Sequence, residues 1–359
     1  MFNTIRKGFF AGSGSAALSE ISVVDKILQL TGKFCTATTM LQSPVRVVYL
    51  GTATYDLQPP RDNQTRCFHA RGCSIVSLDV ADCRNTPSHS TLSDALESAD
   101  VVIVSGGNTL FAVKRWREIG VDVLIKNAAA RGAVMTGGSA GAICWFDGGH
   151  SDSMDPETYR EYMLRAAGLL PPTAATTMTT TSEGTSTDEA SEAPVGAPSK
   201  SWKYIRISGL GLLPGLLCPH HDRTQSNGRP RYADFDEMLL RHQGERGIVI
   251  DHWAALVVEE GRYHVFSTPN KEGSCVVVAA ASSSSDAAAP QDSKTTTSTF
   301  VTDGSGVPAV WWKEVIDGEV VRHSVPFEGG SLEELLKQAE SIDLDPLEEL
   351  CAAENPTQY

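Results

Sequence analysis

The residue with the clearest chemical potential is Ser139, within the run Gly-Gly-Ser-Ala-Gly-Ala that spans residues 137–142. The run fits the pattern G-x-S-x-G, in which a strand turns sharply into a helix and presents a nucleophilic serine at the end of a sheet. The apolar run 133–136 precedes the motif, and small residues that can begin a helix follow it. The pattern therefore predicts that Ser139 is the nucleophile of a serine hydrolase. A glycine-rich ligand-binding turn without a covalent role is the alternative.

A second glycine-containing turn, Ser-Gly-Gly-Asn-Thr at 105–109, lies one strand–helix unit before the serine. Loops at the carboxyl ends of parallel strands gather at one edge of a sheet, so the two turns should be neighbours. Backbone amides of Gly106 or Gly107, together with that of Ala140, are the candidates for an oxyanion hole. Asn108 is a candidate substrate contact. An ordinary strand-to-helix turn is the alternative.

A nucleophilic serine needs a base, and His220 and His221 follow Pro219 at the end of a short apolar run. That position would deliver an imidazole to the active edge of the sheet, where it could take the proton of the serine. A metal site formed by these histidines and Asp222 is the less favoured interpretation, because no further cluster of ligands accompanies them.

The base in turn needs an orienting carboxylate, and two aspartates compete for this role. Asp152 follows the serine helix closely, whereas Asp251 ends the apolar run 247–250. Either could instead be an ordinary loop or cap residue. The residues alone leave the choice open.

Five short apolar runs predict the strands that position these residues. Each run is continuous rather than alternating, as expected for strands covered on both faces. The runs are 7–11, 46–50, 74–78, 100–104 and 133–136. Helical patterns at 18–30, 109–118 and 121–130 separate them. The alternation predicts an α/β fold with a doubly wound, mostly parallel sheet and helices on both faces.

The second half of the chain is interrupted by two segments of biased composition, at 171–200 and 279–298. They are rich in Ser, Thr, Ala and acids, which predicts disordered insertions in surface loops. Strands are expected between them at 247–251, 254–259 and 263–267, and a hairpin after them at 308–315 and 319–325. A helix should begin at Ser331. We expect one α/β domain over residues 1–359.

Bulk properties exclude several classes of function. The formal net charge is −14, with 44 acidic and 30 basic residues, which argues against nucleic-acid binding. The eight cysteines form no CxxC pair, so we expect free thiols in a reducing compartment and no metal or other cofactor. No apolar run approaches the roughly 20 residues of a membrane helix. A soluble, cytoplasmic monomer or homodimer is expected.

Together these motifs resemble the aspartyl dipeptidase (peptidase E) family of serine peptidases, whose relatives include cyanophycinase. The family's G-x-SAGA turn matches 137–142, and its GGGNT turn corresponds to 105–109. Its N-P-H segment matches Cys218-Pro219-His220, so the resemblance implies His220 as the base. The resemblance covers most of 5–270 apart from the first insertion. It implies a class I glutamine amidotransferase-like, or flavodoxin-like, fold.

The resemblance also implies a substrate. The family's dipeptidases cleave after an N-terminal aspartate, so a basic residue must bind the substrate side chain. Arg229 aligns best with that role, ahead of Arg231, although a solvated surface pair is the alternative. For the third triad member the family pattern offers both Asp152 and Asp251, and we rank Asp251 first.

The expected function is therefore a serine peptidase acting on dipeptides or short peptides, including those with N-terminal aspartate. Cys218 in place of asparagine, the sequence His-His-Asp at 220–222 and the two insertions depart from the short dipeptidases. These departures leave the substrate open more than the chemistry. The alternatives are a cyanophycinase-like or other amide hydrolase, and an inactive amidotransferase-like binding module.

Overall fold

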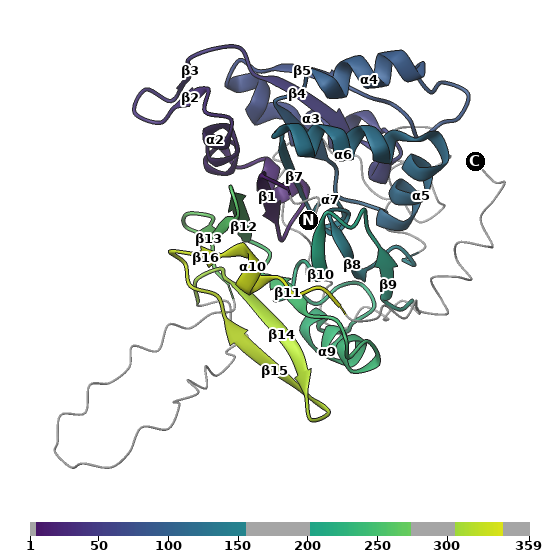
Figure 1. Ribbon diagram of the computed structural model, residues 1–359, viewed down its shortest axis with the longest axis vertical. Coiled ribbons are helices and arrows are strands. Elements are labelled where there is room, and N and C mark those ends of the chain that lie inside the picture. The colour runs from purple at the N-terminus through teal and green to yellow at the C-terminus, as the bar shows by residue number, and fades with distance from the viewer. Residues whose placement is uncertain (1–4, 156–201, 274–305, 340–359) are drawn as a thin grey trace, which may run out of the picture.

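The computed structural model describes residues 5–155, 202–273 and 306–339 (Figure 1). The two predicted insertions, 171–200 and 279–298, lie outside these described residues. The strands form an eight-stranded sheet, a six-stranded sheet and a two-stranded ribbon of β2 (Phe34–Cys35) and β3 (Met40–Leu41).

The eight-stranded sheet contains the predicted parallel strands, in the order β5-β4-β6-β7-β1. All four neighbouring pairs in this order are parallel. The strands are β1 (Lys7–Ala11), β4 (Arg46–Leu50), β5 (Ser74–Ser77), β6 (Val101–Val104) and β7 (Val134–Gly138). Their carboxyl ends therefore lie at one edge, and the α/β doubly wound fold is confirmed.

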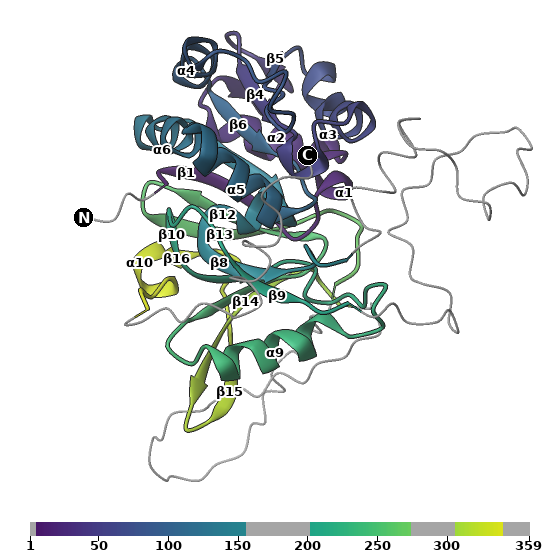
Figure 2. The ribbon, with the colours of Figure 1, turned by 90° about the vertical axis from the view of Figure 1, so that its right-hand side faces the viewer.

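Helices cover both faces of this sheet, as Figure 2 shows. One face carries α1 (Ser15–Leu18), α2 (Ile21–Leu30) and α3 (Gln58–Ala70). The other carries α4 (His89–Glu97), α5 (Thr109–Ile119) and α6 (Val121–Arg131). Successive side chains of β6 enter opposite cores: Val101 and Ile103 pack with the first set, Val102 and Val104 with the second. This is why the strands read as continuous apolar runs.

The helix predicted at 18–30 is interrupted in the structure. α1 ends at Leu18, and α2 begins at Ile21 after Glu20, whose backbone is extended at φ −87° and ψ 123°. The hydroxyl of Ser19 donates to the carbonyl of Ser15 at 2.7 Å and also bonds Asn63. Such side-chain bonds to the backbone compete with helix propagation, which accounts for the break.

Three antiparallel strands extend the same sheet beyond β1. β12 (Ala254–Glu259) pairs with β1, β13 (Arg262–Ser267) with β12, and β16 (Gly330–Ser331) with β13. The short helix α10 (Leu332–Leu335) follows, with Ser331 at its N-cap position as predicted. The helix therefore begins where the sequence predicts, although the Ser331 side chain makes no capping hydrogen bond.

The six-stranded sheet was not predicted as a separate layer. Its order is β15-β14-β11-β10-β8-β9, and β8, β10 and β11 are parallel to one another. The strands are β8 (Phe146–Ser151), β9 (Ile205–Ser208), β10 (Leu213–Cys218), β11 (Gly247–Ile250), β14 (Val310–Ile316) and β15 (Glu319–Ser324). β14 and β15 are the predicted hairpin. Helix α9 (Arg231–Arg241) packs on this sheet.

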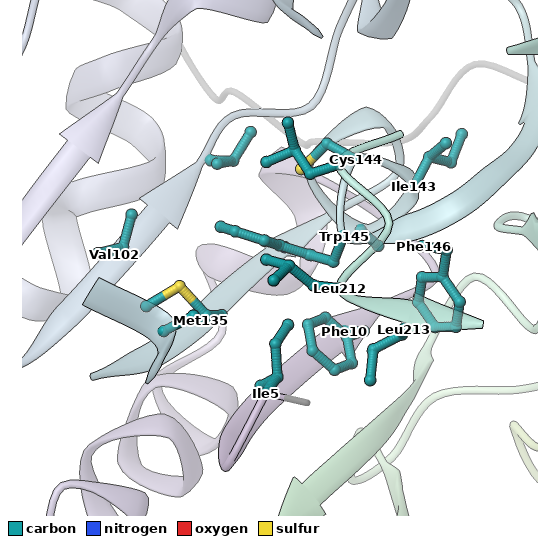
Figure 3. Close-up of a cluster of buried hydrophobic side chains, with 14 of the residues drawn as sticks. Ile5, Phe10, Val102, Met135, Ile143, Cys144, Trp145, Phe146, Leu212 and Leu213 are labelled. Atoms are coloured by element: carbon teal, nitrogen blue, oxygen red, sulfur yellow. The ribbon is translucent and has the colours of Figure 1, made fainter. Parts of the chain in front are cut away.

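One hydrophobic core joins the two sheets (Figure 3). Phe10 of β1 meets Phe146 of β8 edge to face, with ring centroids 5.8 Å apart. Trp145 and Leu213 lie in the same cluster and are fully buried. The packing holds the end of β1 in a fixed position relative to β10 and β11, which carry the predicted histidine and aspartate.

No helix in the described ranges is both long and apolar enough to cross a membrane. The cysteines at 35, 67, 73, 83, 144 and 218 are free thiols.

Candidate active site

Ser139 occupies a strained turn between β7 and the short helix α7 (Ala140–Ile143). Its backbone has φ 55° and ψ −122°, a conformation that residues with side chains rarely adopt and that costs on the order of 1–3 kcal/mol. Strand, turn and helix are arranged as the G-x-S-x-G pattern requires. The serine hydroxyl is buried and makes no hydrogen bond to any described residue.

Close backbone contacts around this turn require glycine. A Cβ added to Gly138 would lie 1.7 Å from the carbonyl oxygen of Ser13. A Cβ on Gly106 would lie 3.4 Å from the carbonyl oxygen of Gly138 and 3.7 Å from the Cβ of Ser139. The glycine turn after β6 therefore lies against the serine turn, as expected for loops at one edge of a parallel sheet.

The three predicted oxyanion-hole residues have different surroundings. A Cβ on Gly107 would lie 2.3 Å from the carbonyl oxygen of Ala53, so this glycine packs on the loop after β4. Gly106 is the one that lies beside Ser139. No hydrogen bond within the described ranges engages the backbone amides of Gly106 or Ala140. Both amides are therefore available donors next to Ser139.

His220 reaches the same edge through the loop after β1. The amide of Ser139 donates to the carbonyl of Ala11, and the amide of His220 donates to the next carbonyl, that of Gly12, each at 3.2 Å. The structure thus bonds the backbones of the predicted nucleophile and base to two consecutive residues, the last residue of β1 and the one that follows it. Burial lowers the pKa of His220 well below its ordinary value, so the imidazole is neutral and can accept a proton.

The hydrogen-bond partner of the His220 ring is a histidine. Nδ1 of His220 lies 2.8 Å from Nδ1 of His252. His252 is buried, and its backbone amide donates to Oδ1 of Asp222 at 2.7 Å. Burial, and then the charge of Asp251, raise the pKa of Asp222 to about 7.

The two predicted acids contact other groups. Oδ1 of Asp251 lies 3.8 Å from Nδ1 of His221, and its Oδ2 accepts from the amide of Ala309. Asp152 lies 3.4 Å from the guanidinium of Arg231. Asp152 directly follows β8 and Asp251 directly follows β11, and the structure places His252 directly against His220.

His252 is the functional candidate that the sequence reasoning missed. The argument that favoured Asp251, delivery by the end of β11, applies equally to the residue that follows it. Consecutive side chains near a strand end point in opposite directions, and only one of the two can face a given neighbour. Here Asp251 faces His221 and His252 faces His220.

The predicted substrate-binding residues are partly engaged. Arg229 is 43% exposed, and its guanidinium lies 3.2 Å from Asp234 and 2.5 Å from Glu237. Asn108 caps α5 by accepting from the amide of Phe111 at 3.0 Å and donates to the carbonyl of Ser153 at 3.3 Å. Asn108 therefore ties the glycine turn to the loop after β8.

A buried polar network supports the site from β8 and α9. Arg231 is fully buried and donates to the carbonyl of His150 at 2.5 Å in addition to contacting Asp152. Nε2 of His150 lies 2.9 Å from Asp234. Burial lowers the pKa of His150 to about 3, and the bond to Asp234 only partly opposes this shift.

This shift predicts how stability depends on pH. Below its ordinary pKa of 6.5, His150 binds a proton in the unfolded chain but stays neutral in the folded protein down to about pH 3. Acidification in that window therefore destabilises the fold by about 1.4 kcal/mol per pH unit for this group. We expect His150→Gln to reduce the slope of unfolding free energy against pH by about that amount, as measured by denaturant titrations between pH 4 and 6.5. The exposed His69→Gln is the control, and equal slopes in the two variants would contradict the prediction.

Among the described residues, no group of three or more His, Cys, Asp or Glu side chains is arranged to hold a metal ion.

Sequence comparisons identify relatives of this chain. The family model described as peptidase family S51 matches residues 18–192, which include Ser139. An uncharacterized peptidase, YgaJ, from Bacillus subtilis is 36% identical over 187 residues, covering 52% of this chain and 59% of that protein. A protein of Trypanosoma brucei brucei named G2/mitotic-specific cyclin-1 is 30% identical over 362 residues, covering 98% of this chain and 94% of that protein.

Remote neighbours of this chain among solved structures include two peptidases. A putative peptidase E protein from Listeria monocytogenes has a TM-score of 0.43 at 16% identity and covers 73% of this chain and 98% of its own. A peptidase from an acI-B1 actinobacterium has a TM-score of 0.48 at 14% identity, covering 76% of this chain and 91% of its own. With the family match across the serine turn, the chain belongs to peptidase family S51, the peptidase E family, and is a serine peptidase.

Proposed function

We propose that the protein hydrolyses dipeptides or short peptides, with a preference for N-terminal aspartate, through Ser139 and His220. The observation that carries the proposal is the strained backbone of Ser139 in a strand–turn–helix, with its hydroxyl unbonded to described residues. Resemblance to the aspartyl dipeptidases supplies the substrate class.

In the proposed reaction, Oγ of Ser139 attacks the scissile carbonyl carbon while Nε2 of His220 takes the hydroxyl proton. The oxyanion that forms is bound by the amides of Gly106 and Ala140, with Gly107 as the further candidate. Collapse breaks the C–N bond, and His220 returns the proton to the leaving amine. Water then attacks the acyl-serine with His220 again acting as base, which regenerates the free hydroxyl.

The acid of the triad stays a prediction. Asp251 lies beside His221, the residue next to the proposed base, and Asp152 lies at the end of β8. Arg229 is the proposed partner of the substrate's aspartate side chain. A substrate carboxylate would exchange for Asp234 or Glu237, which the exposure of Arg229 permits. Asn108 would act by holding the glycine turn in place.

The proposal is tested with purified protein on a panel of substrates. The panel holds Asp-X dipeptides, dipeptides with other N-terminal residues, and β-aspartyl-arginine, with products separated by chromatography. Hydrolysis of the Asp-X members supports the proposal, and hydrolysis of β-aspartyl-arginine alone would favour the cyanophycinase-like alternative. No product from any member, together with no mass adduct on Ser139 after a fluorophosphonate probe, would favour an inactive binding module.

A further inference from the structure

The contact between His220 and His252 gives the proposed base a neutral partner where a carboxylate is expected. The two Nδ1 atoms lie 2.8 Å apart, a normal hydrogen-bond distance, and the rings are tilted by 46° with centroids 4.9 Å apart. One ring nitrogen must donate and the other must accept, so a single hydrogen lies between them. The contact fixes the relative orientation of the two rings and requires that only one of the two Nδ1 atoms carries a hydrogen.

The chemistry of the serine decides which ring donates. His220 can take the Ser139 proton at Nε2 only if Nε2 is bare, so the hydrogen of a neutral His220 must be on Nδ1. His252 then accepts at Nδ1 and carries its own hydrogen on Nε2. Burial favours the neutral form of both imidazoles, and Arg223 and Lys271 add positive charge near His252 that favours it further.

His252 is itself held in place on several sides. Its amide donates to Asp222, and its ring meets the indole of Trp253 edge to face at 4.7 Å. The ammonium of Lys271 lies 4.2 Å over that indole. A buried ring fixed by its backbone and by its neighbours is able to orient another ring, as a triad member must.

We propose that His252 is the positioning residue of the catalytic histidine, so that the site works as a Ser139-His220-His252 relay. This inference rests on the proposed function. During attack, His220 becomes an imidazolium and keeps its Nδ1 hydrogen bonded to His252, which remains neutral. No proton passes to His252, and the proton on Nε2 of His220 goes on to the leaving amine. Asp222 holds His252 in place by accepting a hydrogen bond from its backbone amide.

Three substitutions at one position test the role. The side-chain oxygen of asparagine or aspartate can occupy the place of Nδ1, whereas leucine fills similar volume without an acceptor. We expect His252→Leu to lower kcat on the order of 30-fold with little change in KM, because it leaves the buried Nδ1 hydrogen of His220 unsatisfied. His252→Asn should recover most of that loss.

The pH profile of His252→Asp distinguishes a positioning role from a packing role, because a residue that only packs against His220 would leave that profile unchanged. A carboxylate beside His220 should raise the pKa of this base and shift the acidic limb of the kcat/KM profile upward by about one pH unit or more. His264→Asn on β13 is the control and should leave the profile unchanged. Equal losses of kcat in the leucine and asparagine variants, with unaltered thermal unfolding, would overturn the proposal, as would an unshifted limb in His252→Asp.

A measurement without substrate separates this inference from the proposed function. A hydrogen shared by two buried imidazoles should give a downfield proton resonance in the NMR spectrum of the full-length protein. The resonance should persist in Ser139→Ala and disappear in His252→Leu and in His220→Gln. Its presence in a protein that hydrolyses nothing would count against the proposed function alone. Its absence from the wild-type spectrum would overturn the His220–His252 pair.

Discussion

Ser139→Ala is expected to lower kcat/KM for the best substrate of the panel by at least about 10,000-fold, leaving only the residual effect of binding and the oxyanion donors. The backbone of Ser139 is strained to φ 55°, and its hydroxyl makes no hydrogen bond to any residue that the structure describes. Removing the hydroxyl therefore breaks no hydrogen bond among those residues. The fold should therefore be unaffected. Steady-state kinetics with a thermal unfolding curve of each protein provides the measurement.

The matched control is Ser13→Ala. Ser13 is also buried beside the turn, and its hydroxyl likewise has no partner among the residues that the structure describes. Its loss should change kcat/KM little, because only its carbonyl approaches Gly138. If Ser139→Ala kept activity within about tenfold of wild type, Ser139 would not be the nucleophile.

Arg206→Met is expected to lower the free energy of unfolding by about 3–5 kcal/mol, the largest effect on stability that we predict. Arg206 of β9 is fully buried, and two of its nitrogens contact both carboxylate oxygens of Glu245, at 2.8 and 3.0 Å. Removing the cation leaves a carboxylate that is only 2% exposed without its main partner. Denaturant unfolding monitored by circular dichroism measures the change.

Two controls separate this effect from a simple loss of volume. The double variant Arg206→Met with Glu245→Met removes both charges and should recover most of the stability. Arg6→Met breaks a similarly bidentate pair with Glu260, but that pair is about half exposed and should contribute no more than about 1 kcal/mol. Equal destabilisation by Arg206→Met and Arg6→Met would contradict the importance of burial.

The parallel strands were predictable because a strand that is buried on both faces appears in the sequence as a continuous apolar run. The runs 7–11 and 46–50 match β1 and β4 residue for residue, since no polar position interrupts them. Helix α3 shows no apolar pattern that would predict it, because most of its residues are polar or charged. The second sheet was missed for a different reason: β8 pairs with strands that lie beyond a long segment of the chain, and pairing at that separation has no local pattern.

The sequence predicts which strand ends carry the candidate site residues, but not which side chains contact one another there. The G-x-S-x-G turn and the Pro-His segment predict Ser139 and His220 as nucleophile and base, and in the structure their backbone amides donate to the consecutive residues Ala11 and Gly12. The sequence could not show that His252 rather than Asp251 contacts His220, because a shift of a single residue reverses which side chain faces that ring. Likewise, only packing distinguishes Gly106, which lies beside Ser139, from Gly107, which packs on Ala53.

The carbonyls of Ala11 and Gly12, at the end of β1, have a consequence for which insertions and deletions the chain can accept. Ser139 and His220 follow strands of different sheets, β7 and β10, and lie far apart in the sequence, yet the backbone amide of each donates to one of two consecutive residues, Ala11 and Gly12. The distance between the proposed nucleophile and base therefore depends on these two consecutive residues more than on the chain that connects Ser139 to His220. Segments inserted between the two residues can lengthen or shorten without altering the catalytic spacing, whereas a single-residue deletion at 11–12 would change it at once.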